Sequence, residues 1–399
     1  MAHYKMLDGN AAAVEAMKMA RVQVISAYPI TPQSSISEKL SELVDSGELN
    51  ARYIRVESEH SAMSCAIGAQ LTGVRAATAT ASNGLALMHE VVCVASGCRV
   101  PIVMPIVNRS IASPWSLWCD HQDSMAERDS GWLQFYCENV QDVYDTMLCA
   151  YRIAEDARVQ TPAMVCLDGF FLSHSMQKVN LPEQEQVDAF LGAYTPKNYV
   201  LDPQNPVVID NLTSSGEVTE MKYQQALAFE TSKQVMAEVF ADFAAKFGRT
   251  KAAVEGYRTE DAEAVIVTLG SMSGTAKYVV DTLRAKGQKV GAVKITCFRP
   301  FPVEMLRQVI GSIPKVAVLD RTNGFGAQGT PTWLEVRSAL TGTPQVKGYI
   351  AGLAGRDVHT GTLEKVFADI LAEQGTTFDA PVWIDCRTDE ALKVRQVCV

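Results

Sequence analysis

Apolar residues in the first 175 positions alternate between two spacings, and this alternation predicts an α/β fold. Short apolar runs indicate strands, and the segments between them carry apolar residues every three or four positions, as helices do. The run at 100–107 is almost wholly apolar, as expected of a strand buried on both faces of a parallel sheet. We therefore expect strands at 23–28, 52–56, 75–80, 100–107 and 163–167, and helices at 10–21, 34–43, 59–72, 84–95 and 143–159.

The pattern changes between residues 176 and 256. Polar, proline-bearing connectors at 181–185 and 201–206 precede a long amphipathic segment at 224–247, which predicts a helix. A second α/β unit begins near residue 260, with strands expected at 264–269, 290–296, 316–319 and 349–350, and helices at 275–286 and 303–310. The sequence thus predicts two doubly wound parallel-sheet domains, 1–175 and 257–399, joined by a helical linker at 176–256.

Composition narrows the class of protein. Of 399 residues, 47% are hydrophobic and 20% charged, which is typical of a soluble protein with a large core. The net charge of −9 argues against nucleic acid or an anionic membrane as a partner. No apolar run reaches the roughly 18 residues that span a bilayer, and the first residues do not resemble a signal peptide. We expect a cytoplasmic protein.

The cysteine spacing predicts no metal site. Ten cysteines are scattered along the chain, and no two of them form the close C-x-x-C pair that iron–sulfur and structural zinc sites use. We expect most of them to be buried as small apolar side chains.

Polar side chains follow several predicted strands, where open parallel sheets bind ligands. Thr31 lies in a proline-bounded turn, Glu59 opens a helix, the segment 79–84 is a loop of small polar residues, and Arg109 follows the most apolar strand. A guanidinium at that position suits a planar carboxylate. Each also has a simpler interpretation, namely a stiff turn, a solvated helix cap, a generic loop and an ordinary salt bridge.

Residues 115–131 hold the densest group of functional side chains, including Trp118, Asp120, His121 and Asp123. Aspartates and tryptophans together on an expected loop favour a function over core packing. A single histidine among acids is a weak zinc signal, so we predict no metal here.

These motifs, in this order, resemble the alpha subunit of the pyruvate (2-oxoacid):ferredoxin oxidoreductase family. The resemblance is carried by YPITP at 28–32, ESEHSA at 57–62, ATASNGLALMHE at 79–90, PIVMPIVNRS at 101–110, DHQDSMAERDSGW at 120–132 and ITCFRPFP at 295–302. It extends over about residues 5–370. It implies that the first domain is like the pyrimidine-binding domain of thiamine diphosphate enzymes and the second like the C-terminal domain of transketolase.

The resemblance also implies residue roles. The Glu59 carboxylate would contact N1′ of the aminopyrimidine ring of thiamine diphosphate, and Thr31 and Arg109 would hold the 2-oxoacid during catalysis. Asn83 stands where the family commonly has glutamine, so its own contact is open. Further contacts are expected with the cofactor from Tyr28, Pro29, Ser82 and Asn83, and with the substrate from Trp118, Asp120 and His121.

The implied enzyme needs other subunits. The chain has neither the G-D-G that starts the usual diphosphate and magnesium motif nor paired cysteines for [4Fe–4S] clusters. The resemblance implies a beta subunit with the diphosphate/Mg²⁺ side, a ferredoxin-like delta subunit with the clusters, and a gamma subunit. The reaction would be CoA-dependent oxidative decarboxylation of a 2-oxoacid to acyl-CoA and CO₂, with electrons passing to ferredoxin.

Several alternatives stay open. Pyruvate is the first choice of substrate, because Thr31 is expected with neutral 2-oxoacids, but phenylglyoxylate or a branched-chain 2-oxoacid would fit a larger pocket. The electron acceptor could instead be an NAD-linked partner. The chain could also be a transketolase- or dehydrogenase-E1-type subunit, or a subunit that only buttresses a catalytic partner.

Overall fold

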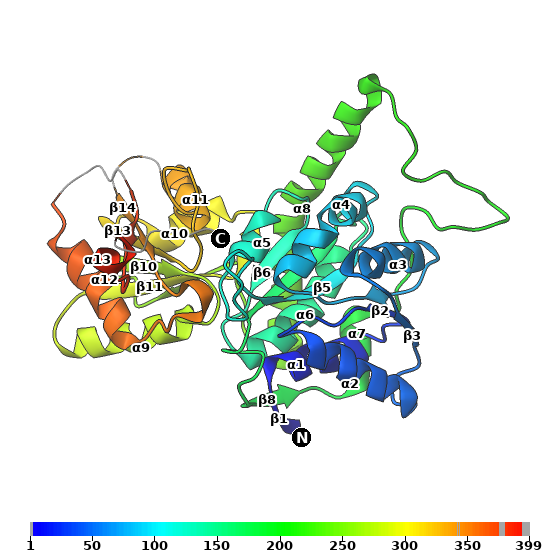
Figure 1. Cartoon of the computed structure of the whole chain (residues 1–399), viewed down its shortest axis with the longest axis horizontal. Helices are drawn as coiled ribbons and strands as arrows, with labels where there is room; N and C mark the ends of the chain where they lie inside the picture. Colours follow the sequence, from blue (N-terminus) through cyan, green and yellow to red (C-terminus); the bar gives the residue numbers. More distant parts are fainter. Residues whose placement is uncertain (1–2, 341, 343, 375–379, 393–399) are drawn as a thin grey trace.

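The computed structural model describes residues 3–340, 342, 344–374 and 380–392. It contains two α/β units, drawn in blue to green and in yellow to red (Figure 1). The expectation of two parallel-sheet α/β units is confirmed. Residues 393–399, which include Cys398 and end the expected second domain, lie outside the described residues.

The first unit is built on a sheet in two hydrogen-bonded parts. One part has the order β3-β2-β4 and the other β12-β6-β7-β5, and an isolated parallel bridge between Thr80 and Ile106 joins β4 to β5. All neighbouring strands are parallel except β12, which comes from the later part of the chain and runs antiparallel to β6. The strands are β2 (Val24–Ala27), β3 (Arg52–Arg55), β4 (Ala76–Ala77), β5 (Val103–Asn108), β6 (Leu133–Tyr136), β7 (Ala163–Asp168) and β12 (Cys297–Arg299).

Helices cover both faces of this sheet. Because side chains alternate along β5, Val103 and Val107 join the core under α1 and α6, whereas Met104 and Ile106 join the core under α3 and α4. The helices of the unit are α1 (Gly9–Met19), α2 (Ser34–Asp45), α3 (Glu59–Leu71), α4 (Ser82–Gly97), the short α5 (Gln122–Ala126) and α6 (Val140–Ala154). A two-stranded antiparallel sheet that the sequence did not reveal pairs β1 (His3–Leu7) with β8 (Gln177–Leu181), and α7 (Gln184–Leu191) follows β8.

The second unit has one six-stranded sheet of order β15-β14-β13-β10-β11-β9, in which β9 is antiparallel and the other strands are parallel. Its strands are β9 (Val254–Tyr257), β10 (Ala264–Thr268), β11 (Val290–Ile295), β13 (Lys315–Asp320), β14 (Gln345–Ile350) and β15 (Val382–Trp383). Its helices are α9 (Met272–Ala285), α10 (Val303–Ile310), α11 (Pro331–Ala339), the 3₁₀ turn η1 (Leu353–Gly355), α12 (Thr360–Ala372) and α13 (Thr388–Ala391).

The linker helix α8 (Ser215–Phe247) begins nine residues before the predicted start at 224. Its later half packs through Val235, Phe240 and Phe243 into the core of the first unit, while its first turns project as an arm (Figure 1). The prediction missed the arm because an exposed helix has no apolar stripe to reveal its period.

Six of the nine described cysteines are buried, as expected of small apolar side chains. Among the described helices, none is both long and apolar enough to cross a bilayer.

Candidate functional site

Four neighbouring strands of the first sheet end next to the residues that the sequence singled out. Thr31 follows β2, Glu59 begins α3 after β3, Ser82 begins α4 after β4, and Arg109 follows β5. The sheet places β3, β2, β4 and β5 side by side and parallel, so their carboxyl ends form one edge. The expectation that these residues share an edge of the sheet agrees with the structure.

Glu59 is a buried carboxylate at the start of α3, where the Ser58 hydroxyl caps the helix. The Glu59 side chain is only 7% exposed, and it forms no hydrogen bond or ion pair with another described residue. Across from it, a Cβ on Gly84 would lie 2.6 Å from both Glu59 Oε1 and Thr80 Oγ1, so the glycine leaves room for these oxygens. Thr80 Oγ1 is also buried and has no partner in the described part of the chain. Buried polar groups without partners are costly, and these two mark a place for a ligand.

Arg109 is held by backbone carbonyl groups. Its Nε donates to the Ser116 carbonyl and its Nη1 to the Thr31 carbonyl, both at 2.9 Å. No ion pair of Arg109 occurs among the described residues, so the ordinary salt bridge is not seen there. Burial lowers the pKa of Arg109, but a guanidinium stays charged at neutral pH. Its Nη2 group forms no hydrogen bond with a described residue, and the neighbouring loop Tyr28–Thr31 is largely exposed.

The loop after β4 is attached to the loop after β5. Ser82 has a left-handed backbone, with a φ of +52°, and its hydroxyl donates to the Ser110 carbonyl. The exposed Asn83 accepts a hydrogen bond from the Ala112 N–H at 3.0 Å through its Oδ1. In this structure the Asn83 side chain therefore fixes the loop that follows Arg109.

Asp120 and His121, both expected to bind substrate, lie in the contact between the two units. The Asp120 carboxylate accepts from the Ala354 N–H at 3.1 Å, and His121 Nε2 lies 2.7 Å from an oxygen of Asp168. Arg321 of the second unit also binds Asp168, at 3.0 Å. Asp120 is 1% and His121 0% exposed. Their contact with substrate stays a prediction, whereas their contact with the second unit is observed.

Cys119, His121 and Asp168 bring three potential metal ligands within 4.8 Å of one another. Arg321 Nη1 lies 3.0 Å from Asp168 and 3.8 Å from Cys119 Sγ. The guanidinium supplies a positive charge at the position where a cation would need to bind, and its repulsion disfavours a metal ion in this arrangement.

An aromatic group beside the site includes a residue that sequence reasoning missed. Trp118 is 54% exposed, and its ring centroid lies 4.6 Å from that of Phe170. Phe170 follows β7 with a φ of +62°, and a Cβ on the preceding Gly169 would meet Pro32 Cγ at 2.9 Å. The signal available in the sequence was the position of Gly169 and Phe170 after the buried strand at 163–167.

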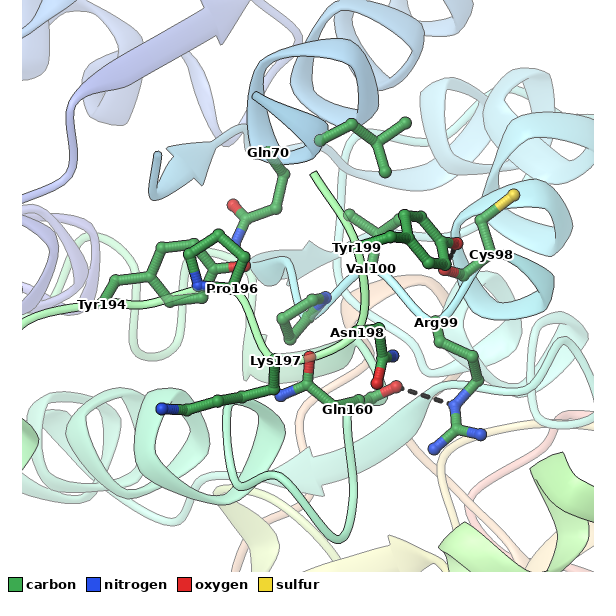
Figure 2. Close-up of a pocket in the computed structure, with 12 residues that line it drawn as sticks. Gln70, Cys98, Arg99, Val100, Gln160, Tyr194, Pro196, Lys197, Asn198 and Tyr199 are labelled. Atoms are coloured by element: carbon green, nitrogen blue, oxygen red, sulfur yellow. Dashed lines mark hydrogen bonds between the residues drawn. The ribbon is translucent and has the colours of Figure 1, made fainter. Parts of the chain in front are cut away.

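The cavities differ in size and place. A cleft of about 620 Å³ lies between residues 110–128 of the first unit and residues 322–354 of the second, and it borders the site at Ser110. Figure 2 shows another pocket, beneath the loop at 194–199, with a volume of about 10 Å³, which is enough for one water molecule. Gln70 and Leu71 line that small pocket, so it lies at the end of α3 opposite Glu59.

Family models match most of the chain. Residues 15–241 match the model described as "Pyruvate flavodoxin/ferredoxin oxidoreductase, thiamine diP-bdg", and residues 262–363 match "Pyruvate:ferredoxin oxidoreductase core domain II". The chain is 45% identical to pyruvate synthase subunit PorA of Pyrococcus horikoshii over 388 residues, which cover 96% of this chain and 98% of PorA. It is also 46% identical to ketoisovalerate oxidoreductase subunit VorA of the same organism over 371 residues, 92% of this chain and 93% of VorA.

Solved structures share the fold. A 2-oxoglutarate:ferredoxin oxidoreductase from Magnetococcus marinus matches with a TM-score of 0.71 and 20% identity, over 92% of this chain and 65% of that chain. A split-gene transketolase matches with a TM-score of 0.51 and 13% identity, over 91% of this chain and 94% of that one. At such identities the likeness shows the fold alone.

Proposed function

This chain belongs to the pyruvate:ferredoxin oxidoreductase family, and on that basis we propose that it is the alpha subunit of a thiamine-diphosphate-dependent 2-oxoacid:ferredoxin oxidoreductase. The complete enzyme converts a 2-oxoacid and CoA to acyl-CoA and CO₂ and passes the electrons to ferredoxin. The observation that carries the proposal is the buried Glu59 carboxylate, which lacks a partner within the described chain and lies at the same edge of the sheet as Arg109.

The residues around Glu59 fit the aminopyrimidine ring of thiamine diphosphate. Glu59 and the Thr80 hydroxyl are buried without partners among the described residues, and Gly84 leaves the adjoining space open. Glu59 would hold a proton at ring nitrogen N1′, and Tyr28, Pro29, Ser82 and Asn83 would line the ring's surroundings. When bound, the cofactor would supply a thiazolium ring, which accepts the electron pair left on the former carbonyl carbon by decarboxylation.

Arg109 and Thr31 would hold the 2-oxoacid. The two carbonyl contacts of Arg109 fix its guanidinium plane and leave Nη2 to hydrogen-bond the substrate carboxylate. Thr31 lies on the loop whose backbone Arg109 binds, so its hydroxyl would lie near the same ligand. Together the two residues would orient the carboxylate that leaves as CO₂.

Other subunits complete the proposed enzyme. With no G-D-G sequence, the chain lacks the usual start of a diphosphate and Mg²⁺ site, which we assign to a beta subunit. The [4Fe–4S] clusters would lie in a ferredoxin-like delta subunit, with a gamma subunit completing the complex. A soluble ferredoxin or an NAD-linked partner would accept the electrons.

The substrate is proposed to be pyruvate, with a branched-chain 2-oxoacid or phenylglyoxylate as the alternative. Identity does not separate them, because PorA and VorA are 45% and 46% identical to this chain. A test of larger substrates is worthwhile, because the rings of Trp118 and Phe170 contact each other and Gly169, the neighbour of Phe170, packs against Pro32.

The experiment is to purify the complex with Glu59→Gln and assay 2-oxoacid- and CoA-dependent reduction of ferredoxin. We expect kcat to fall at least ~100-fold, the scale of a lost general acid–base group. Glu57→Gln is the matched control, because Glu57 is exposed and binds only the nearby Ser61 hydroxyl in the described chain. Full activity of an assembled Glu59→Gln complex would instead favour the buttressing role. Absence of iron–sulfur absorbance from the active complex would favour a dehydrogenase-E1-type enzyme.

A further inference from the structure

Asp123, in the first turn of α5, is a buried carboxylate that the proposed chemistry does not use. It is 1% exposed and forms no ion pair with a described residue. Its oxygens instead accept four hydrogen bonds from N–H donors, of which one begins α4 and two lie at the end of β5. Such a set satisfies the carboxylate fully, so its position and that of its donors are fixed together.

The two carboxylate oxygens of Asp123 accept hydrogen bonds from different donors. Oδ2 accepts from the backbone N–H of Ser82 at 2.9 Å and from that of Arg109 at 3.0 Å. Oδ1 accepts from Asn108 Nδ2 and from the Ser124 N–H, both at 2.8 Å. Asp123 therefore joins the first residue after β5 to the first residue of α4.

This connection matters because the sheet is weakly paired at that point. Between β4 and β5 the described backbone pairing is the isolated bridge from Thr80 to Ile106. Ser82 also adopts a left-handed backbone conformation, which is unfavourable for a residue other than glycine. The contacts of Ser82 must therefore stabilise it. The hydrogen bonds to Asp123 hold both loops in register where the pairing between strands is short.

Burial raises the pKa of Asp123 to about 6, against the opposing effect of its hydrogen bonds from Asn108, Arg109 and Ser82. At neutral pH the group is therefore ionised, and it can only accept hydrogen bonds.

We propose that Asp123 is a positioning residue for the 2-oxoacid site: it fixes the backbone of Ser82 and Arg109, and through Arg109 it sets the grip on the substrate carboxylate. The inference rests on the proposed function, in which Arg109 binds that carboxylate. Asp123 itself touches neither the substrate nor the cofactor in this assignment.

The test is a double-variant cycle in the assembled complex, with Asp123→Asn, Arg109→Lys and both together, measuring kcat and KM for pyruvate and 2-oxoisovalerate. Asparagine offers one acceptor oxygen where aspartate offers two, so one pair of donors loses its acceptor. We expect Asp123→Asn to raise KM about 10-fold with a smaller change in kcat, on the scale of lost supporting contacts. The double variant should have nearly the KM of Arg109→Lys alone, because both changes act through one contact.

A second measurement does not depend on turnover. Hydrogen–deuterium exchange of the Ser82 and Arg109 amides should be at least about 10-fold faster in Asp123→Asn. Asp145→Asn is the matched control, because Asp145 on α6 is also buried, at 4% exposure, but binds Arg249, which follows α8. It should leave the KM and both amides unchanged. If Asp123→Asn prevents assembly, Asp123→Glu, which retains a carboxylate, replaces it in the double-variant cycle.

The outcomes separate the two claims. A KM for Asp123→Asn within twofold of wild type, single-variant effects that multiply in the double variant, or unchanged exchange at both amides would overturn the positioning role alone. An unchanged KM in Arg109→Lys would remove the substrate contact from the proposed function and the positioning role with it.

Discussion

Gly84 provides a way to move the Glu59 carboxylate without removing it. Gly84 lies in the first turn of α4, and a Cβ at this position would lie 2.6 Å from Glu59 Oε1 and from Thr80 Oγ1. Gly84→Ala therefore introduces one methyl group close to both oxygens, neither of which has a partner among the described residues. The change leaves the charge and the hydrogen-bonding groups of the site as they were.

The size of the effect follows from the distances. Ordinary van der Waals contact of a Cβ begins at 3.4 Å, so Glu59 Oε1 must move by about 0.8 Å. A displacement of about 1 Å in a reacting group can cost ~100-fold in rate. Alanine is a better helix former than glycine by roughly 1 kcal/mol, which offsets part of an overpacking cost of about 1–3 kcal/mol. We therefore expect a large loss of activity with little loss of stability.

The assay is ferredoxin reduction by the reconstituted complex, together with the thermal midpoint of the purified chain. Gly84→Ala should lower kcat about 100-fold and shift the midpoint by only a few degrees. Gly97→Ala, at the other end of α4, and Gly68→Ala, on α3, are the controls, because a Cβ at either position meets no atom within 4 Å. A Gly84→Ala enzyme that retained wild-type kcat would refute the claim that the position of Glu59 is catalytically important.

The remaining predictions concern the contact between the units, acid stability and substrate size. Asp168→Asn should lower the free energy of unfolding by about 3–5 kcal/mol, because it leaves buried Arg321 without its charge partner; a loss below 1 kcal/mol in urea titration would contradict this. Although burial alone would raise it, His121 and Arg321 hold the pKa of Asp168 well below its usual range. The stabilisation is therefore complete above the unfolded-state pKa of about 4 and is lost as pH falls through the lower folded-state value, so wild type and Asp168→Asn should converge in stability below pH ~4. Trp118→Ala should change the ratio of kcat/KM between pyruvate and bulky 2-oxoacids, and an unchanged ratio would exclude Trp118 from the pocket.

Local patterns in the sequence were sufficient for most of the elements around the site. Helix α3 begins at Glu59, as predicted, because the serine cap and the following small residues form a local signal. Arg109 likewise follows a strand whose continuous apolar run is visible in one short segment. Parallel strands present their carboxyl ends at a common edge, so placing these residues after strands also predicted their shared location.

Contacts between distant segments could not be predicted in this way. Asp120 and His121 were predicted to contact substrate, which stays a prediction, and the sequence did not indicate that both are buried against the second unit, where Asp168 binds Arg321, 153 positions away. Nothing local to residues 120–121 encodes that partner. The same applies to β12, a strand after residue 296 that completes the first sheet beside β6.

By itself, the sequence determined the helices and strands, the α/β class with two units, and the strand ends at which the residues of the candidate site lie. Only the tertiary structure decided which of those side chains keep a free polar group and which are used in packing. The period of apolar residues depends only on which face of a helix or strand is buried. The partner of a buried charge such as Asp123 or Asp168 depends instead on which distant segments of the chain pack beside it. The Glu59 carboxylate has no partner among the described residues, because Gly84 of α4 and Thr80, in the loop before α4, leave it space and offer it no positive charge.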